Sequence, residues 1–468
     1  MGMTLQTVYR QYGRPEEGRE LRRRIADELR RKRIRMVVID DDPTGIQTVH
    51  GCLLLTEITA ERIAQALDDA APFFYLLVNS RAMTECDARR VVREAVEATL
   101  EANREKGYNL LFVSRSDSTL RGHFPAESDT IREVLVEHEM QVVMPSLFVP
   151  AFFEAGRMTV DGVHYMQQGD QLLPTSETEF ARDNVFHYST SILTDYMVEK
   201  GQGQLTADDL THLRLEDLRT IDLAEQLRVN RKKKYISSDA FDYRDLRRLA
   251  IAVLAQYEMG KRHQCGVIRS SSSLPKALSG IEEQAYVVAP KSNARGVVVV
   301  GSHVKKSTEQ LNALLELDGT EGIEIDVERI LGHDEKQQGE LIARAVACYE
   351  AGVVPVFYTS RREIRIDDVA ARQALGVEIS RFLVELVRAL PFVPDFLISK
   401  GGITSHDILT HSLEVKTARV AGQAAAGIPT LCTTTESPFP EMLYVIFPGN
   451  VGVVESLKEV VANIRNRA

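Results

Sequence analysis

The chain has 468 residues, which is too long for one compact core and predicts two domains of α/β size. Apolar residues make up 44% and charged residues 26% of the sequence, the balance of an ordinary soluble globular protein. The net charge of -10 argues against a nucleic-acid partner, because a nucleic-acid binder usually carries a basic face.

The sequence also bears on the compartment. No apolar run is long enough to cross a bilayer, and the N-terminus lacks the apolar core of a signal peptide. The five cysteines are scattered without metal-ligand spacing, which is typical of reduced thiols and not of a disulfide framework. We therefore expect a cytoplasmic protein with no membrane partner.

Residues 1–35 are polar and rich in arginine, and we interpret them as an N-terminal helical extension. Leu21, Ile25 and Leu29 recur at four-residue spacing between arginines, which predicts an amphipathic helix. The same stretch could form a basic nucleic-acid patch. A solvated helix whose apolar stripe packs on the body is the simpler interpretation.

Residues 36–280 alternate short apolar runs with helical periodicity. The runs at 36–40, 73–78, 111–115 and 141–145 predict buried strands. Strands that alternate with helices predict a mostly parallel sheet covered on both faces. Residues 150–230 are more irregular and polar, and we interpret them as an insertion or cap over that sheet.

A second α/β unit is predicted at 296–468, after a mixed segment at 279–295. The stretches 296–317, 396–409 and 444–461 each read as a strand, a small-residue turn and a helix, and 353–359 reads as a further strand.

Three strand ends of the first unit carry polar residues that could do chemistry. Residues 40–45 place three aspartates after one strand, which is costly unless cations, hydroxyls or water offset their repulsion. Residues 115–122 gather arginines, hydroxyls and a carboxylate, and residues 79–81 add a third polar end. Arginine can hold a carboxylate through two hydrogen bonds, while Asp and Ser can bond sugar hydroxyls.

In the second unit, three strands end in glycine-containing turns: Gly301 with Ser302, residues 401–404, and residues 449–452. Glycine lets the backbone approach a ligand, and helix N-terminal amides favour anionic oxygens. The turns therefore predict a nucleotide or phosphate site at the carboxyl edge of the sheet. The sequence contains neither a P-loop nor a dinucleotide fingerprint. Lys400 could meet a phosphate, although a solvated lysine is the more frequent case.

Together these motifs resemble the four-carbon acid sugar kinase family. The resemblance rests on DDPTG (41–45), NSR (79–81), SDSTLRG (116–122) and FEAGRMTVDGVHY (153–165), and it continues in GS (301–302), SKGGITS (399–405) and FPGNVG (447–452). It implies two α/β domains with mostly parallel sheets and an active site in the cleft between them. The domain at 36–280 would bind the acid sugar, and the domain at 296–468 would bind ATP.

The resemblance further implies a kinase that uses ATP and Mg²⁺ to convert a four-carbon sugar acid, of the threonate, erythronate or 3-oxo-tetronate type, to its 4-phosphate. A homodimer is a family-level possibility, and no residue is predicted as a metal ligand. On the acid side fall Asp41, Asp42, Arg81, Asp117, Ser118, Arg121 and Gly122. On the ATP side fall Ser302, Gly401, Gly402, Ile403, Thr404 and Gly449.

Phosphoryl transfer requires positioning, charge stabilisation and a group that accepts the hydroxyl proton. We predict Asp42 or Asp117 as that base. Arg81 and Arg121 would hold the carboxylate, and the glycine turns would cradle the phosphates. Departures from the family pattern include Pro43, the Lys400 turn without an acidic residue before its threonine, and FPGNVG in the last loop.

Two alternatives remain. Asp40-x-Asp42-x-Thr44 also fits a haloacid dehalogenase-type phosphatase, in which Asp40 would be the nucleophile and Asp42 an acid or base. That mechanism needs a later lysine and an acidic pair after another strand. Asp367-Asp368 is the only obvious candidate for the pair, and the glycine turns are left unexplained. The second alternative is a sugar-acid sensor that has lost catalysis.

Overall fold

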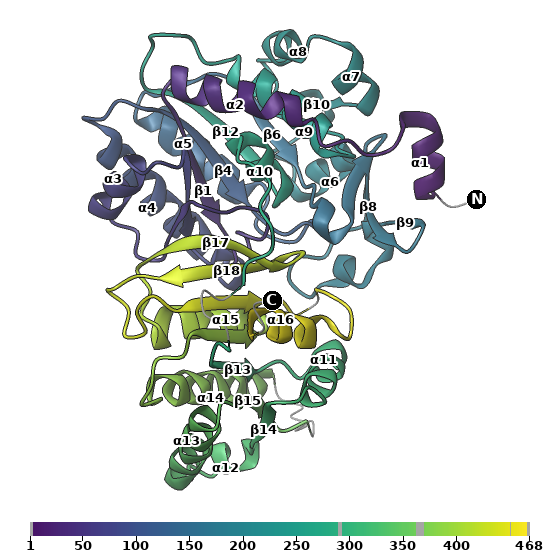
Figure 1. Cartoon of the computed structure of the whole chain (residues 1–468). Coiled ribbons are helices and arrows are strands. Elements are labelled where there is room, and N and C mark those ends of the chain that lie inside the picture. The colour runs from purple at the N-terminus through teal and green to yellow at the C-terminus, as the bar shows by residue number, and fades with distance from the viewer. Residues whose placement is uncertain (1–2, 289–292, 362–368, 450, 466–468) are drawn as a thin grey trace. The chain divides into compact units, whose positions relative to one another are not determined.

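The structure, a computed structural model, describes residues 3–288, 293–361, 369–449 and 451–465. The chain divides into two compact units, Met1–Glu283 and Gln284–Ala468. Figure 1 colours the chain from its N-terminus to its C-terminus, so the first unit runs from purple to teal and the second from green to yellow.

A parallel sheet forms the centre of the first unit, with strand order β10-β11-β6-β12-β4-β1-β3-β2. Parallel strands end at one edge, and the register places Asp40 beside Arg115 and Arg115 beside Ser270. The polar strand ends named above therefore meet at one edge of this sheet. The strands are β1 (Ile34–Asp40), β2 (Leu53–Leu55), β3 (Phe73–Leu77), β4 (Asn109–Arg115), β5 (Gln141–Val142), β6 (Ser146–Val149), β10 (Leu210–Leu213), β11 (Tyr235–Ser238) and β12 (Gln264–Ser270).

Helices cover this sheet, and apolar side chains of α3, α4 and α5 pack with Val37, Phe74 and Phe112 in one buried cluster. The predicted amphipathic helix is α2, in which Ile25 and Leu29 are buried. The helices are α1 (Leu5–Tyr12), α2 (Arg19–Arg31), α3 (Ala60–Leu67), α4 (Glu85–Asn103), α5 (Ala126–Glu137), α6 (Leu193–Lys200), α7 (Leu215–Thr220), α8 (Leu223–Val229), α9 (Tyr243–Leu254) and α10 (Ser273–Ser279).

Two predictions for the first unit need correction. The strand predicted at 141–145 is reduced to the two residues of β5, which pair with β12, and the chain pairs with β12 again at β6. Pro145 lies between β5 and β6. It interrupts the ladder of hydrogen bonds, because proline has no N–H to donate. The irregular stretch at 150–230 contains an antiparallel sheet of β7 (Arg157–Val160), β8 (Val163–Gln168) and β9 (Gln171–Pro174), and it also supplies the edge strand β10 of the main sheet.

The second unit has its own sheet, with strand order β17-β18-β19-β16-β13-β15-β14. The pairs from β19 to β14 are parallel, whereas β17 and β18 form an antiparallel extension that the sequence analysis missed. Val298, Val356, Ile398 and Val445 form the centre of its core. The strands are β13 (Gly296–Val300), β14 (Thr320–Ile325), β15 (Val354–Thr359), β16 (Phe396–Lys400), β17 (Thr417–Ala425), β18 (Ile428–Thr433) and β19 (Leu443–Phe447).

The remaining elements flank this second sheet. The helices are α11 (Lys305–Leu315), α12 (Val327–Leu331), α13 (Glu335–Glu350), α14 (Val369–Arg388), α15 (Gly402–Asp407) with a π-helical turn at Ile408–Ser412, and α16 (Ser456–Arg465). The predicted α/β class with mostly parallel sheets is thus confirmed.

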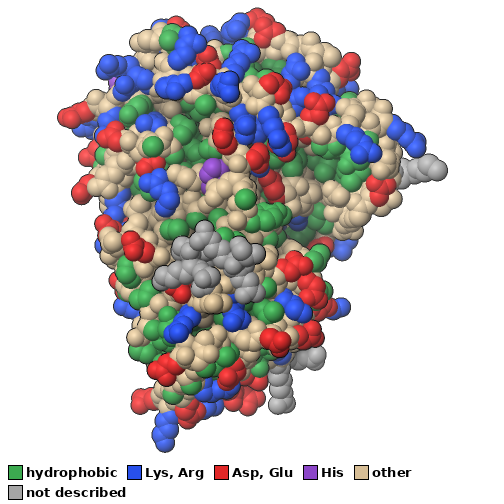
Figure 2. Space-filling view, viewed as in Figure 1, with side chains coloured by type: hydrophobic (Ala, Val, Ile, Leu, Met, Phe, Trp, Pro, Cys, Tyr) green, Lys and Arg blue, Asp and Glu red, His purple; other side chains and the backbone are tan. Residues whose placement is uncertain are grey.

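Lysine and arginine side chains alternate with acidic ones over the face drawn in Figure 2. Within α2, Arg30 pairs with Asp27 and Arg31 pairs with Glu28. Separately, none of the helices in the described ranges is long and apolar enough to span a membrane.

Candidate functional site

Asp41 is the organising carboxylate at the end of β1. It is buried and accepts two hydrogen bonds from Arg81, from Nη2 to Oδ1 at 2.6 Å and from Nε to Oδ2 at 3.0 Å. Ser116 Oγ also donates to Asp41 Oδ2 at 2.5 Å. Bidentate charge-assisted bonds of this kind fix geometry as well as charge. Asp41 therefore joins all three predicted motifs, and its direct contact with a substrate stays a prediction.

Asp42 is the most exposed of the three aspartates, with 20% of its side chain accessible. Its Oδ1 accepts hydrogen bonds from the Thr44 amide at 2.7 Å and from the Thr44 hydroxyl, and its Oδ2 lies 3.3 Å from Arg81 Nη1. Burial raises the pKa of Asp42, but the charges of Arg81 and Arg115 and the Thr44 bonds outweigh burial and leave the pKa below its ordinary value. Asp42 is thus a carboxylate at neutral pH.

Asp40 is completely buried, and its Oδ1 lies 3.2 Å from Arg115 Nη1. Gly45 packs on its carboxylate so closely that a Cβ there would lie 1.8 Å from Oδ2. Burial raises the pKa of Asp40 to about 8 despite the charge of Arg115. A nucleophile must reach its substrate, so this burial argues against the phosphatase alternative. The Asp367-Asp368 pair that this alternative would need lies outside the described residues.

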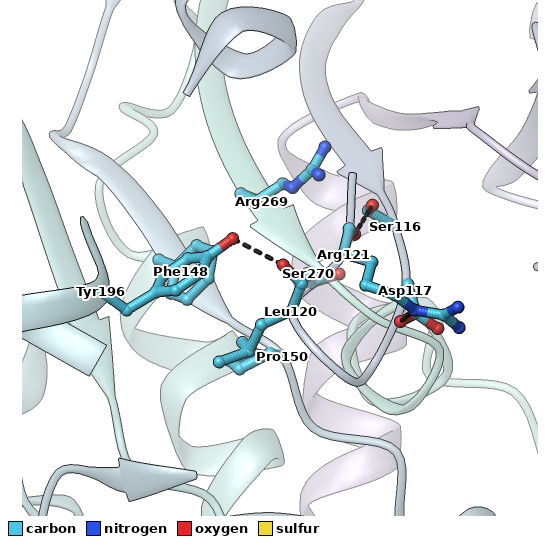
Figure 3. A pocket seen from close by; sticks show the side chains of 9 residues that line it. All are labelled: Ser116, Asp117, Leu120, Arg121, Phe148, Pro150, Tyr196, Arg269 and Ser270. Atoms are coloured by element: carbon cyan, nitrogen blue, oxygen red, sulfur yellow. Dashed lines mark hydrogen bonds and ion pairs between the residues drawn. The ribbon is translucent and has the colours of Figure 1, made fainter. Parts of the chain in front are cut away.

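The 116–122 loop, which follows β4, forms part of the wall of a small cavity of about 10 Å³. Arg121 Nε donates to Asp117 Oδ2 at 2.9 Å. Although burial opposes ionisation, the charges of Arg121 and Arg81 hold the pKa of Asp117 well below its usual range. Figure 3 shows Asp117 and Arg121 side by side at the cavity wall. The lining consists of Ser116, Asp117, Leu120, Arg121, Phe148, Pro150, Tyr196, Arg269 and Ser270.

Arg269 belongs to this wall and was missed in the sequence. Only 4% of its surface is exposed, and Nη1 donates to Ser114 Oγ at 2.7 Å and pairs with Glu127. A Cβ on Gly122 would lie 2.8 Å from Arg269 Nη2 and 2.4 Å from Ser116 Oγ, so only glycine fits at position 122. The sequence did contain a signal for Arg269. The pair Arg269-Ser270 ends an apolar run, as the pair Arg115-Ser116 does.

In the second unit, the predicted turns follow the neighbouring strands β13, β16 and β19. The first two turns touch, since a Cβ on Gly301 would lie 2.2 Å from Thr404 Oγ1 and one on Gly401 would lie 3.3 Å from Ser302 Cβ. Gly401 has φ +118°, a conformation that other residues rarely adopt. Gly402 is the first residue of α15, and the Ile403 side chain is 75% exposed.

The expectation of a solvated Lys400 is wrong. The residue ends the central strand β16 and is fully buried, and its Nζ donates to the carbonyl oxygens of Pro448 at 2.6 Å and Gly449 at 3.1 Å. Burial lowers the pKa of Lys400 to about 7. Lys400 therefore connects the second glycine turn to the third.

Arg361, which follows β15, was also missed. Its Nη1 donates to the Ser302 carbonyl at 2.6 Å and its Nη2 to the Val300 carbonyl at 3.2 Å. Burial lowers the pKa of Arg361. The Arg361 guanidinium also lies over the Tyr358 ring, 5.7 Å from its centroid.

Comparison with family models gives each unit a description. Residues 36–278 match the model of a sugar-binding N-terminal domain, and residues 297–457 match the model of a nucleotide-binding C-terminal domain. These matches cover both candidate sites.

Two curated relatives are kinases. The chain is 26% identical over 307 residues to a D-erythronate kinase from Heliobacterium modesticaldum, which covers 63% of this chain and 64% of that protein. It is 31% identical over 225 residues to a D-threonate kinase from Bordetella bronchiseptica, which covers 46% of this chain and 49% of that protein. The chain thus aligns with about half to two thirds of the length of these relatives.

Solved structures share the fold. A Haemophilus influenzae protein matches with a TM-score of 0.64 and 17% identity over 92% of this chain and 100% of its own. A Salmonella typhimurium protein, provisionally described as a tRNA synthase, matches with a TM-score of 0.66 and 16% identity over 92% of this chain and 98% of its own. At such low identity these neighbours support the fold alone.

Proposed function

Because the chain belongs to the four-carbon acid sugar kinase family, we propose that it is an ATP-dependent kinase with a four-carbon sugar acid as its acceptor. The acid would be of the threonate, erythronate or 3-oxo-tetronate type, and the product would be its 4-phosphate. The observation that carries this proposal is the cavity formed by Asp117, Arg121 and Arg269 in the unit that matches the sugar-binding model. This cavity wall combines a carboxylate that can accept a proton, Asp117, with two arginines that can bind the substrate carboxylate.

The arginines of the first unit divide into two groups in this proposal. Arg121 and Arg269 line the cavity, so they would bind the substrate carboxylate through charge-assisted hydrogen bonds. Arg81 is already engaged by Asp41 and Asp42. The predicted contact of Arg81 with the acid remains part of the proposal. Its support is the hydrogen-bonding capacity that Arg81 retains beside its bonds to the two aspartates.

Asp117 is the better candidate for the base. It lines the cavity, whereas Asp42 does not. Its Oδ2 accepts hydrogen bonds from Arg121 and Thr119, while its Oδ1 accepts none from the residues that the structure describes. A low pKa makes Asp117 a weak base, but phosphoryl transfer through a loose transition state makes small demands on proton removal.

ATP would bind at the second unit, where the glycine turns let main-chain amides approach phosphate oxygens. Arg361 and Lys400 hold the carbonyls of two turns, so the amides keep their positions. No group of three or more His, Cys, Asp or Glu side chains that could hold a metal occurs within the described ranges. Mg²⁺ commonly needs only one or two carboxylates besides phosphates, so we propose that it arrives with ATP, where it neutralises developing charge.

The test is ADP formation from Mg-ATP with the erythronates, the threonates and 3-oxo-tetronate, with acid-free controls. We expect one acid to give turnover far above the control. If no acid gives turnover, titration calorimetry with the same acids shows whether an acid still binds. Binding of an acid without turnover would favour the sensor alternative, and absence of both would overturn the proposal.

A further inference from the structure

The 116–122 loop is held by an unbroken row of hydrogen bonds to its main-chain carbonyls. His164 Nε2 bonds the Ser118 oxygen at 2.7 Å. Tyr188 Oη donates to the Thr119 oxygen at 2.8 Å and also lies 3.2 Å from the Thr175 oxygen. Tyr196 Oη donates to the Leu120 oxygen at 2.7 Å, a bond drawn in Figure 3. From inside the loop, Ser116 Oγ lies 3.1 Å from the Arg121 oxygen, although its one proton also serves the shorter bond to Asp41 Oδ2.

The conformation of this loop needs such support. Leu120 has φ +66° and Gly122 has φ +120°. A left-handed conformation costs a non-glycine residue energy, and it persists only where the surroundings over-determine it. Asp117 and Arg121 lie on either side of Leu120, so the geometry of the cavity wall depends on that backbone.

The three outer donors come from a part of the chain that lies outside the parallel sheet. His164 lies in β8, Tyr188 in the segment before α6, and Tyr196 in α6. All three are buried, and both tyrosines pack with Leu120 in one apolar cluster. Side chains of the insertion predicted at 150–230 therefore contact the loop that carries the proposed acid site.

His164 is fixed in one tautomer by its two partners. Its Nδ1 lies 2.9 Å from Thr159 Oγ1 and its Nε2 lies 2.7 Å from a carbonyl oxygen, which can only accept. The carbonyl therefore requires a proton on Nε2, and a neutral ring accepts the Thr159 hydroxyl at Nδ1. Burial and the nearby Arg157 charge lower the pKa of His164 to about 4, in keeping with a neutral donor.

We propose that His164, Tyr188 and Tyr196 are positioning residues that hold the 116–122 loop in the shape that presents Asp117 and Arg121 to the acid. The inference rests on the proposed acid site for its consequence in catalysis. The effect on the loop itself does not depend on any activity.

The test replaces each hydroxyl without altering packing, with Tyr188→Phe and Tyr196→Phe. Tyr257→Phe is the matched control, because Tyr257 is also buried and donates to a main-chain carbonyl, that of Leu110 in β4, at 2.9 Å. One lost hydrogen bond should raise the KM for the acid about five- to tenfold and leave the KM for ATP unchanged. Tyr257→Phe should change thermal stability alone.

His164 allows a test by rescue. His164→Leu removes the donor, whereas His164→Gln keeps an N–H near the Nε2 position. We expect a raised KM for the acid in the first variant and recovery of most of the affinity in the second.

Hydrogen exchange makes the outcome independent of turnover. Amides of residues 117–122 should exchange faster in Tyr188→Phe and Tyr196→Phe than in the parent protein and in Tyr257→Phe. Equal exchange in all four proteins would overturn the positioning role, whatever the acid assay gives. Faster exchange in a protein that phosphorylates no acid would leave the positioning intact and overturn only the proposed function.

Discussion

The carboxylates at the strand ends have different proposed roles, and each role can be tested by replacing one residue. Asp117 lines the cavity and Asp42 does not, so Asp117→Asn should lower kcat by about 10², the lower end of the usual contribution of a general base, because a loose transition state makes small demands on proton removal. The KM for ATP should stay unchanged. Steady-state kinetics with the acid found in the panel checks this.

Asp183→Asn is the control for Asp117→Asn, because Asp183 also faces Arg121, at 3.5 Å, and does not line the cavity. Its removal should change kcat less than threefold, the effect of a partly exposed ion pair. Full activity in Asp117→Asn together with a collapse in Asp42→Asn would move the base to Asp42.

Lys400 gives a second prediction at the residue scale. Burial lowers the pKa of Lys400 from its ordinary value of 10.5 to about 7 in the folded protein. Between these values the unfolded state binds the additional proton, so stability rises with pH in this window, by at most about 1.4 kcal/mol per pH unit, and the contribution is flat below pH 7. Lys400→Met should therefore flatten the rise of Tm between pH 7 and pH 9.5.

The exposed Lys305 provides the comparison, since 91% of its side chain is accessible. Lys305→Met should retain the parent's dependence of Tm on pH. If Lys400→Met keeps the same slope as Lys305→Met, then Lys400 stays charged in the folded protein and its burial has another explanation.

At the scale of elements, the sequence predicted best where local pattern and tertiary context agree. The runs at 36–40 and 73–78 became β1 and β3 because each is apolar throughout and sits inside a parallel sheet. The run at 141–145 failed because Pro145 interrupts the ladder. Strand β17 was missed because buried and less buried residues alternate along it, so it lacks the continuous apolar run that predicted the other strands.

The residues of the candidate site also divide into those that the local sequence reveals and those that only the tertiary fold brings together. Strand ends such as 40–45 and 115–122 could be found from sequence, because polar residues directly after an apolar run are visible in the chain. Partners such as His164 and Tyr196 could not, since they reach the loop only through the tertiary fold. Lys400 was misjudged for a similar reason: its acceptors are carbonyls that lie 48 and 49 residues along the chain.

The 116–122 loop gives a prediction for a whole element. Gly122→Ala places a Cβ 2.4 Å from Ser116 Oγ and 2.8 Å from Arg269 Nη2, at a φ of +120°. We expect a loss of unfolding free energy of roughly 2–4 kcal/mol in the first unit, from backbone strain and overpacking together, and loss of acid binding. Thermal unfolding and calorimetry with the acid measure the two effects.

Gly169→Ala is the control for strain alone. Gly169 has φ +62° and nothing within 4 Å of a Cβ, so its replacement should cost roughly 1 kcal/mol and leave acid binding intact. Equal acid affinity in both variants would mean that the loop relaxes freely, and the tight packing around Gly122 would then have no role in binding.

At the scale of the whole molecule, the two units present different chemistries at corresponding edges of their sheets. The first unit gathers carboxylates, arginines and hydroxyls, whereas the second gathers glycine turns held by Arg361 and Lys400. Each unit has its own core, and each matches its own family model. The division predicts that each ligand binds without the other.

Hydrogen exchange of the intact chain tests this division. Mg-ADP alone should slow exchange at 301–304 and 401–404 and leave 116–122 unchanged, because main-chain amides of the glycine turns would bind the phosphates. The acid alone should slow exchange at 116–122 and leave both turns unchanged. The segment 223–229, which is α8, belongs to neither site and should be indifferent to both ligands. Protection of 116–122 by Mg-ADP alone would assign the nucleotide to the first unit, and the proposed roles of the two units would then have to be exchanged.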